Sequence, residues 1–247
     1  MAGGKETPRQ KMIGMMYLVL TALLALQVSN AVLEKFIFID KALKAAGDEI
    51  REKNTGIVTS IQQEVEKKGN RADDKKVLNK AQEVRNKTQE LLSYMDETRK
   101  KMAEMTGGYD ENNQLVGAKD YDIVANYMIQ KGNGEELKKR LNSYAAELEK
   151  MTGDKFDKLA KPASEIDIAK NDPNQNTKDF SNYYFGSTPT AAGMATISHL
   201  ESEVLNYESR ALGKLATEVG AKDFEATDVF ALVRPTSNTV AAGADFE

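Results

Sequence analysis

Arg9 and Tyr17 are the side chains whose types and spacing first suggest chemistry. On a helix, Tyr17 lies about 80° round from Arg9 and two turns further along, so both side chains can reach one neighbour. An arginine at the start of an apolar segment is a counter-charge for a carboxylate, because an unpaired ion in lipid is costly. We therefore expect these two residues to bind a carboxylate that a partner supplies in a membrane.

Catalytic chemistry has little basis elsewhere in the chain. The sequence contains no cysteine and a single histidine, His199, which excludes thiolate nucleophiles, histidine-based triads and histidine-based metal clusters. Gly132-Asn133-Gly134 could bind an anion at a helix start, but no Lys-Ser/Thr follows it, which favours a plain helix separator. We expect no enzymatic activity, no cofactor and no metal site.

The element that must position Arg9 is an apolar helix at the start of the chain. Residues 12–33 contain no Asp, Glu, His, Lys or Arg. At about 1.5 Å per residue they cover roughly 33 Å, enough for one pass through a hydrocarbon core of about 30 Å. The basic residues Lys5, Arg9 and Lys11 precede them, which predicts a cytoplasmic tip at 1–11 and a body outside the cytoplasm.

A secretory signal peptide is the alternative interpretation of this start. It also combines basic residues with an apolar stretch, and Ser29-Asn30-Ala31 could serve as its cleavage site. The length of the apolar stretch favours the anchor. Because the span holds no Asp, Glu, His, Lys or Arg, any proton-carrying carboxylate would have to come from another subunit.

The span is better suited to a helix bundle than to a lone anchor. Thr7, Pro8 and Gln10 match a capping box, which starts the helix at about Pro8 and places the charge of Arg9 against the helix dipole. The strictly apolar part, 12–26, is only roughly 22 Å long, so polar groups at one end need a protein partner. A stripe for close helix packing in the membrane consists of Gly14, Leu18, Thr21, Ala25 and Ser29.

The rest of the chain reads as an exported helical body. The net charge of the whole chain, −4, excludes the usual nucleic-acid binder. We predict an all-α fold, in which one transmembrane helix at 12–33 continues into a helical-bundle domain at 34–222. Helical periodicity runs on from the span to Lys67 and recurs at 72–106, 135–151 and 189–219, with shorter pieces at 121–130 and 154–159 and a loop at 171–188.

The last segment has a different pattern. Residues 228–235 are rich in β-branched side chains and close at a proline, which is typical of a strand. We therefore expect residues 223–247 to be the beginning of a second, β-rich domain that continues in a longer chain.

The opening residues resemble a known family. Ala2-Gly3-Gly4-Lys5, Thr7-Pro8-Arg9-Gln10-Lys11-Met12 and Met16-Tyr17-Leu18-Val19 closely resemble the N-terminus of the GldM/PorM family, the inner-membrane motor subunits of gliding motility and type IX secretion. The resemblance extends more loosely over the helical body, including Ser187-Thr188-Pro189. It implies one transmembrane helix, a helical first periplasmic domain and further β-rich domains.

The resemblance also implies partners. In such a motor, a pair of family helices stands inside a ring of GldL subunits. Proton flow through the ring turns the helix pair and the ring against each other. The periplasmic dimer then carries the motion to GldK and GldN. Arg9 would pair with a GldL glutamate, and Tyr17 would correspond to the family's membrane tyrosine. We predict a subunit that couples the proton-motive force to periplasmic movement; the alternative is a passive single-pass envelope scaffold or sensor.

Overall fold

The computed structural model describes residues 7–221, except for the side chains of residues 22–30. Within that range the chain is helical, and the one β feature is an isolated bridge between Tyr109 and Leu115. The all-α class is thereby confirmed for the described residues, whereas the predicted strand at 228–235 lies outside them. The elements are α1 (Pro8–Lys67), α2 (Ala72–Met105), α3 (Asp122–Val124), the π-helix η1 (Ala125–Gln130), α4 (Asn133–Thr152), the 3₁₀ turn η2 (Ala163–Glu165), α5 (Phe180–Phe185) and α6 (Thr190–Glu218).

Helix α1 runs without a break for 60 residues, as the periodicity predicts. The predicted capping box is present: the Thr7 hydroxyl accepts from the Gln10 amide, and the Gln10 side chain accepts from the Thr7 amide at 2.9 Å. After Pro8 the helix contains no proline that would kink it. It ends where Gly69 and Asn70 turn into the left-handed region, at φ values of 77° and 57°.

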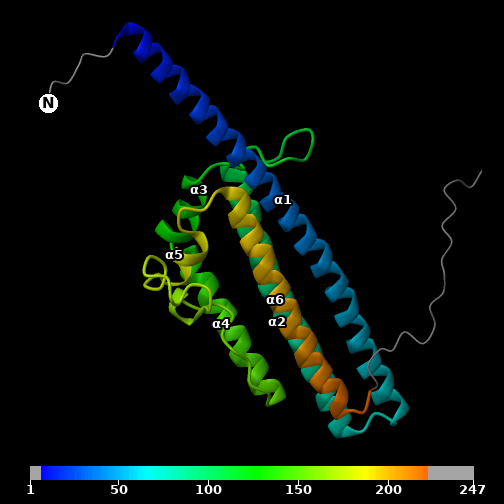
Figure 1. Cartoon of the computed structure of the whole chain (residues 1–247). Helices are drawn as coiled ribbons and strands as arrows, with labels where there is room; N and C mark the ends of the chain where they lie inside the picture. The colour runs from blue at the N-terminus through cyan, green and yellow to red at the C-terminus, as the bar shows by residue number, and fades with distance from the viewer. Residues whose placement is uncertain (1–6, 222–247) are drawn as a thin grey trace, which may run out of the picture.

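Helix α6 lies at the centre of the bundle (Figure 1). It packs against α1 and runs parallel to it, and α2 lies on both helices in the opposite direction. Helices α4 and α5 cover the side of α2 and α6 that faces away from α1. Apolar residues at helical spacing in α6 are buried, including Ile197, Leu200 and Leu212.

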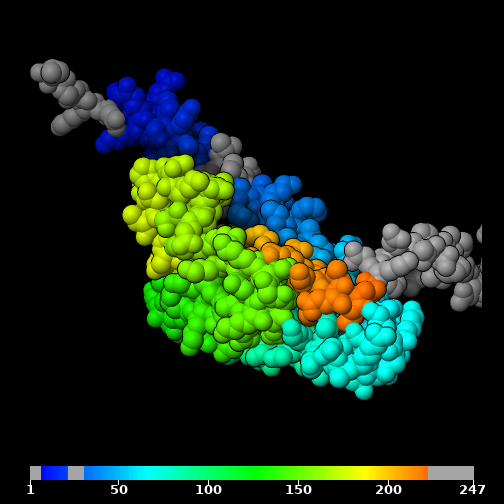
Figure 2. Space-filling model, turned by 90° about the horizontal axis from the view of Figure 1, so that it is seen from below, coloured from blue at the N-terminus to red at the C-terminus, as the bar shows by residue number. Residues whose placement is uncertain are grey.

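The N-terminal part of α1 stands apart from this body (Figures 1 and 2). Residues 7–21 are all exposed, and Leu33 is the first buried residue along α1 among those whose side chains are described. Over the residues that the structure describes, no helix has a segment with the length and apolarity needed to cross a membrane. The predicted span at 12–33 includes residues 22–30, whose side chains are not described, so the span stays a prediction.

Two segments differ from their predictions. Residues 180–185, expected in a loop, form α5 because Asp179 caps them, its carboxylate accepting from the Asn182 amide at 2.8 Å, while Phe180 and Phe185 are buried. Residues 154–159 are not helical. Gly153 ends α4 at a φ of 74°, and the Asn142 side chain then holds the backbone of Ala160 through two bonds of 3.0 Å.

The start of α6 is capped by the loop before α3 instead of by Ser187 or Thr188. The amide of Thr190 donates to the Asp120 carbonyl at 2.8 Å, and the amide of Ala191 donates to the Ala118 carbonyl at 3.0 Å. Since the first amides of a helix lack partners within it, these carbonyls satisfy two of them. The loop at 106–121 is therefore held against the start of α6.

The close approach of α6 to α3 gives a test of this packing. A Cβ atom on Gly193 would lie 2.9 Å from a Val124 methyl carbon, whereas one on Gly213 of the same helix would meet open space. Gly193→Ala should lower the free energy of unfolding by about 1–3 kcal/mol through overpacking. Gly213→Ala should raise it by up to about 1 kcal/mol through helix propensity. Urea unfolding followed by circular dichroism measures both, and equal stabilisation by the two variants would contradict the packing.

Candidate functional site

Helix α1 meets the bundle through residues at steps of seven. These are Leu33, Asp40, Gly47, Asn54 and Ile61, of which all but Asp40 are buried. A seven-residue period keeps one face of a helix against a neighbouring helix. Because two of the five side chains are polar, the interface between α1 and its neighbours must contain polar partners.

The first set of partners lies near the point where α1 leaves the bundle; we name Asp40, Arg99 and Ser198 the exit cluster. Arg99 of α2 is only 5% exposed. Its guanidinium donates to the Asp40 carboxylate at 2.9 Å, to the Ser198 hydroxyl at 2.7 Å and to the Met194 carbonyl. The Ser198 hydroxyl in turn donates to Asp40 at 2.7 Å. One buried charge thus joins α1, α2 and α6.

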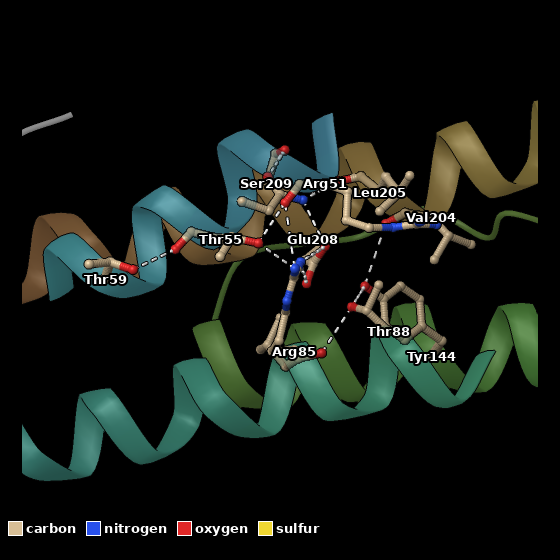
Figure 3. Close-up of polar contacts among 12 residues, drawn as sticks. Arg51, Thr55, Thr59, Arg85, Thr88, Tyr144, Val204, Leu205, Glu208 and Ser209 are labelled. Carbon is tan, nitrogen blue, oxygen red and sulfur yellow. Dashed lines mark hydrogen bonds and ion pairs between the residues drawn. The ribbon is translucent and has the colours of Figure 1, made fainter. Parts of the chain in front are cut away.

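The second set lies two heptads further along α1 and is drawn in Figure 3; we name Asn54, Arg85 and Glu208 the middle cluster. Asn54 and Glu208 are both 0% exposed. The Asn54 amide donates to the Glu208 carboxylate at 2.7 Å and to the Leu205 carbonyl at 3.1 Å. Arg85 reaches across from α2 to both carboxylate oxygens, at 3.0 and 3.2 Å. The same three helices are joined again.

Helix α4 is tied to this interface by a buried phenol. The Tyr144 hydroxyl lies 2.8 Å from the Thr88 hydroxyl, which itself donates to the Val84 carbonyl at 2.9 Å. Tyr144 therefore donates its proton to Thr88, with the Val204 carbonyl 3.5 Å away. Burial raises the pKa of the Tyr144 phenol, which keeps it a neutral donor.

A third contact joins the far ends of α1 and α6. The Lys68 ammonium, just after α1, donates to the Val219 carbonyl, just after α6. A cation at this place also suits the negative end of the α6 dipole. We name the exit cluster, the middle cluster and this contact together the polar seam.

The polar seam determines one register between α1 and its neighbours. A slip of α1 by one heptad, roughly 10 Å, would remove Asn54 from Glu208 and Asp40 from Arg99. Buried charges that lose a partner cost several kcal/mol. Displacement of α1 along its axis is therefore resisted at two levels of the bundle, and the bundle follows the helix.

Glu201 is the one carboxylate at this interface whose charge is poorly supported. Its Oε1 atom is buried and has no hydrogen-bond partner among the described residues. Burial, with the nearby carboxylates of Asp96 and Asp40, raises its pKa to about 7, although Arg99 and Lys44 act in the opposite direction. At neutral pH this side chain is divided between its protonated and ionised forms.

The residues predicted to act in a membrane lie on the projecting part of α1. Arg9, Gly14, Tyr17, Leu18 and Thr21 are all exposed there, and the continuous helix places them as the predicted spacing requires. The Thr21 hydroxyl donates to the Tyr17 carbonyl, so it is satisfied within the helix. The other two predicted packing residues, Ala25 and Ser29, belong to the segment whose side chains are not described.

The polar seam was not predicted from the sequence. The seven-residue recurrence of Leu33, Asp40, Gly47, Asn54 and Ile61 is visible in the printed chain and could have indicated it. Its partners on α2 and α6 have no such signal, because charged residues recur along both of these helices. His199, the lone histidine, is exposed, and the part of the chain that the structure describes has no cluster of three potential metal-ligating side chains.

Comparison with known proteins gives one match. A family model described as the GldM N-terminal domain matches residues 31–218. The matched range begins just before Leu33 and includes every residue of the exit and middle clusters. No curated protein shows a significant match to the chain.

Removing Arg85 tests the middle cluster. Arg85→Leu should lower the free energy of unfolding by roughly 2–4 kcal/mol, because the buried Glu208 carboxylate loses its charged partner. Adding Glu208→Met should recover part of the loss, since no buried charge is then left. The control is Lys138→Met, in an exposed pair with Glu135, which should change the value by less than about 1 kcal/mol. Equal effects of Arg85→Leu and Lys138→Met in urea unfolding would contradict the assignment.

Glu201 gives a pH dependence of known sign. A carboxyl whose folded pKa is about 7, above the ordinary 4.5, binds a proton more tightly in the folded state. Its contribution should therefore lower the stability by roughly 2–3 kcal/mol as the pH rises from about 4.5 to 7. Glu201→Gln should abolish this part of the dependence. Thermal unfolding of both proteins from pH 4.5 to 8 measures it, and parallel curves would show that the Glu201 pKa is ordinary.

Proposed function

We propose, from the premise that the chain belongs to the GldM N-terminal domain family, that it is a motor subunit of gliding motility and type IX secretion. In this role it works with GldL and transmits energy of the proton-motive force from the inner membrane into the periplasm. The role is mechanical, without catalysis or a cofactor. The observation that carries the proposal is the unbroken helix α1, which joins an exposed apolar end to a body held around it in one register.

The membrane part of the proposal rests on the start of α1. We propose that residues 12–33 cross the inner membrane, with 1–11 in the cytoplasm and the body in the periplasm. The support is the charge-free sequence of this stretch and the exposure of large apolar side chains along it, such as Met16, Leu18 and Leu20. Such side chains need lipid or partner helices around them.

The coupling part rests on what this stretch lacks. With no Asp, Glu, His, Lys or Arg between Met12 and Leu33, the chain holds no carboxylate or imidazole there that could carry a proton. We propose that a GldL glutamate is the carrier and that Arg9 binds it when it is ionised, with Tyr17 beside the pair. Gly14, Leu18, Thr21, Ala25 and Ser29 would form the face for close packing, against GldL or a second copy of this chain.

The transmission part rests on the polar seam. A rotation or push applied to α1 at its membrane end reaches α2 through Arg99 and Arg85, and α6 through Ser198 and Glu208. The chain then continues from the end of α6. We propose that a dimer of such bodies carries the motion outward and that domains after residue 222 deliver it to GldK and GldN.

A passive envelope scaffold or sensor is the second candidate. It would share the anchor and the helical body, and the rigid α1 would also suit a fixed post. The two roles differ in what they demand of Arg9, because a scaffold needs no counter-charge for a proton carrier.

The test is Arg9→Ala in the cell. The variant should insert and fold as the wild type does but lose type IX secretion and gliding, because the partner carboxylate then has no counter-charge. The matched control is Lys11→Ala, which removes the same charge about 200° round the helix. Secretion assays, with membrane fractionation to establish insertion, measure both. Normal secretion by Arg9→Ala would rule out the coupling role and favour the scaffold.

A further inference from the structure

Exposed apolar side chains gather at one end of the helical body. Beyond the projecting part of α1, the large apolar residues that stand exposed there are Phe38 and Ile39 of α1, Met105 at the end of α2, and Tyr109, Val116 and Tyr121 of the segment that follows. We name these six the exit-end patch. Phe38 is 70% exposed and Val116 is 61% exposed.

Several contacts show that the six share one end. Because α2 runs antiparallel to α1, its last turns lie beside the first bundled turns of α1, as the Arg99–Asp40 pair shows. A groove of about 330 Å³ lies between Ile37 of α1, Leu115 of the loop and Met194 of α6. The Asp120 and Ala118 carbonyls, close to Tyr121, cap the start of α6. The patch thus surrounds the place where α1 leaves the body.

The opposite end of the body has a different surface. The turn between α1 and α2 and the first turn of α2 carry charged side chains, including Lys67, Arg71, Asp73 and Lys76, and these are exposed. Apart from the six, the exposed large apolar side chain among the described residues of the body is Ile168, between η2 and α5. The asymmetry indicates that the exit end meets an apolar environment that the other end does not.

The distance along α1 identifies that environment. Phe38 follows Leu33 by five residues, or roughly 8 Å. The polar layer on each side of a hydrocarbon core is about 5–8 Å thick, so a span that ends at Leu33 places the patch at the headgroup level. Tyrosine and phenylalanine side chains are favoured at that level, where the ring is apolar and the tyrosine hydroxyl stays hydrated.

We propose that the exit-end patch rests on the lipid surface of the membrane, with the loop at 109–121 as an interfacial anchor. The proposal rests on the proposed function, in which residues 12–33 cross that membrane. Two points of contact, the span and the loop, then determine the tilt of the body over the bilayer. Without the loop, the orientation of the body would depend on α1 alone.

The net negative charge of the loop indicates that this contact depends on burial of apolar side chains and not on attraction to anionic lipids. Three acidic residues, Asp110, Glu111 and Asp120, stand against one Lys119. Part of this charge is used locally, since the Asp110 carboxylate accepts from the Asn112 and Gln114 amides at 2.9 and 2.8 Å. The excess of acid still opposes an anionic surface. The contact should therefore be weaker on a bilayer rich in phosphatidylglycerol than on one of phosphatidylethanolamine and phosphatidylcholine.

The absence of cysteine from the chain allows a clean test. Single cysteines are introduced into the full chain by Val116→Cys in the patch, by Ile168→Cys as the exposed apolar control, and by Leu20→Cys in the span. Each is labelled with the fluorophore NBD and reconstituted into phosphatidylethanolamine–phosphatidylcholine nanodiscs with acyl chains brominated near the headgroup end. Quenching by bromine then reports contact with lipid, and circular dichroism establishes that the variants fold.

The label at 116 should be quenched several-fold more than the label at 168, and less when phosphatidylglycerol replaces phosphatidylcholine. Tyr121→Ser in the Val116→Cys background should reduce the quenching, and Tyr121→Trp should keep it. If the label at position 20 is quenched but the label at 116 is quenched no more than the label at 168, the lipid contact is overturned while the span stands. If the label at 116 is shielded from water but is not quenched by bromine, a protein occupies the patch and the proposal is wrong. If the label at 20 is not quenched, residues 12–33 do not cross the membrane and the patch proposal fails as well.

Discussion

The buried charges between α1, α2 and α6 constrain the rest of the structure. Arg99 and Glu208 are almost completely removed from water, so each must keep its partners on the neighbouring helices. Apolar side chains tolerate a shifted neighbour, whereas these ion pairs and the Asn54 amide are satisfied in one arrangement only. The crossing of α1 over the bundle, and with it the direction in which the projecting end points, follows from that requirement.

Small residues and capping groups complete the arrangement that the charges specify. Gly193 lets α6 approach α3 so closely that an added Cβ would lie 2.9 Å from a Val124 methyl carbon. At Gly47, where α1 meets α6, an added Cβ would only reach contact distance, 3.4 Å from a Leu205 methyl carbon. The carbonyls of Ala118 and Asp120 accept from the first amides of α6 and so hold the loop at 106–121 against the start of that helix. Close packing and satisfied helix ends together leave few alternative positions for the three long helices.

The sequence predicts the helices well and their polar contacts poorly. The capping box at Thr7 and the end of the first helix at Lys67 both follow from local patterns, and the structure confirms them. The helix at Phe180–Phe185 was missed because its stability comes from burial of two phenylalanines, which a loop-like composition conceals. The Arg85–Glu208 pair spans 123 residues of sequence, and nothing local distinguishes it from the exposed pairs of this charge-rich chain.

The parallel direction of α1 and α6 determines how the interface between them bears mechanical load. A force that enters at Pro8 and leaves after Val219 pulls the two helices past each other along their length, which is shear. In shear, the exit cluster, the middle cluster and the Lys68 contact are strained at the same time and share the load. An antiparallel pair loaded from one end would instead be peeled, and its contacts would break one after another. The topology therefore makes a set of individually modest contacts act as a single strong joint.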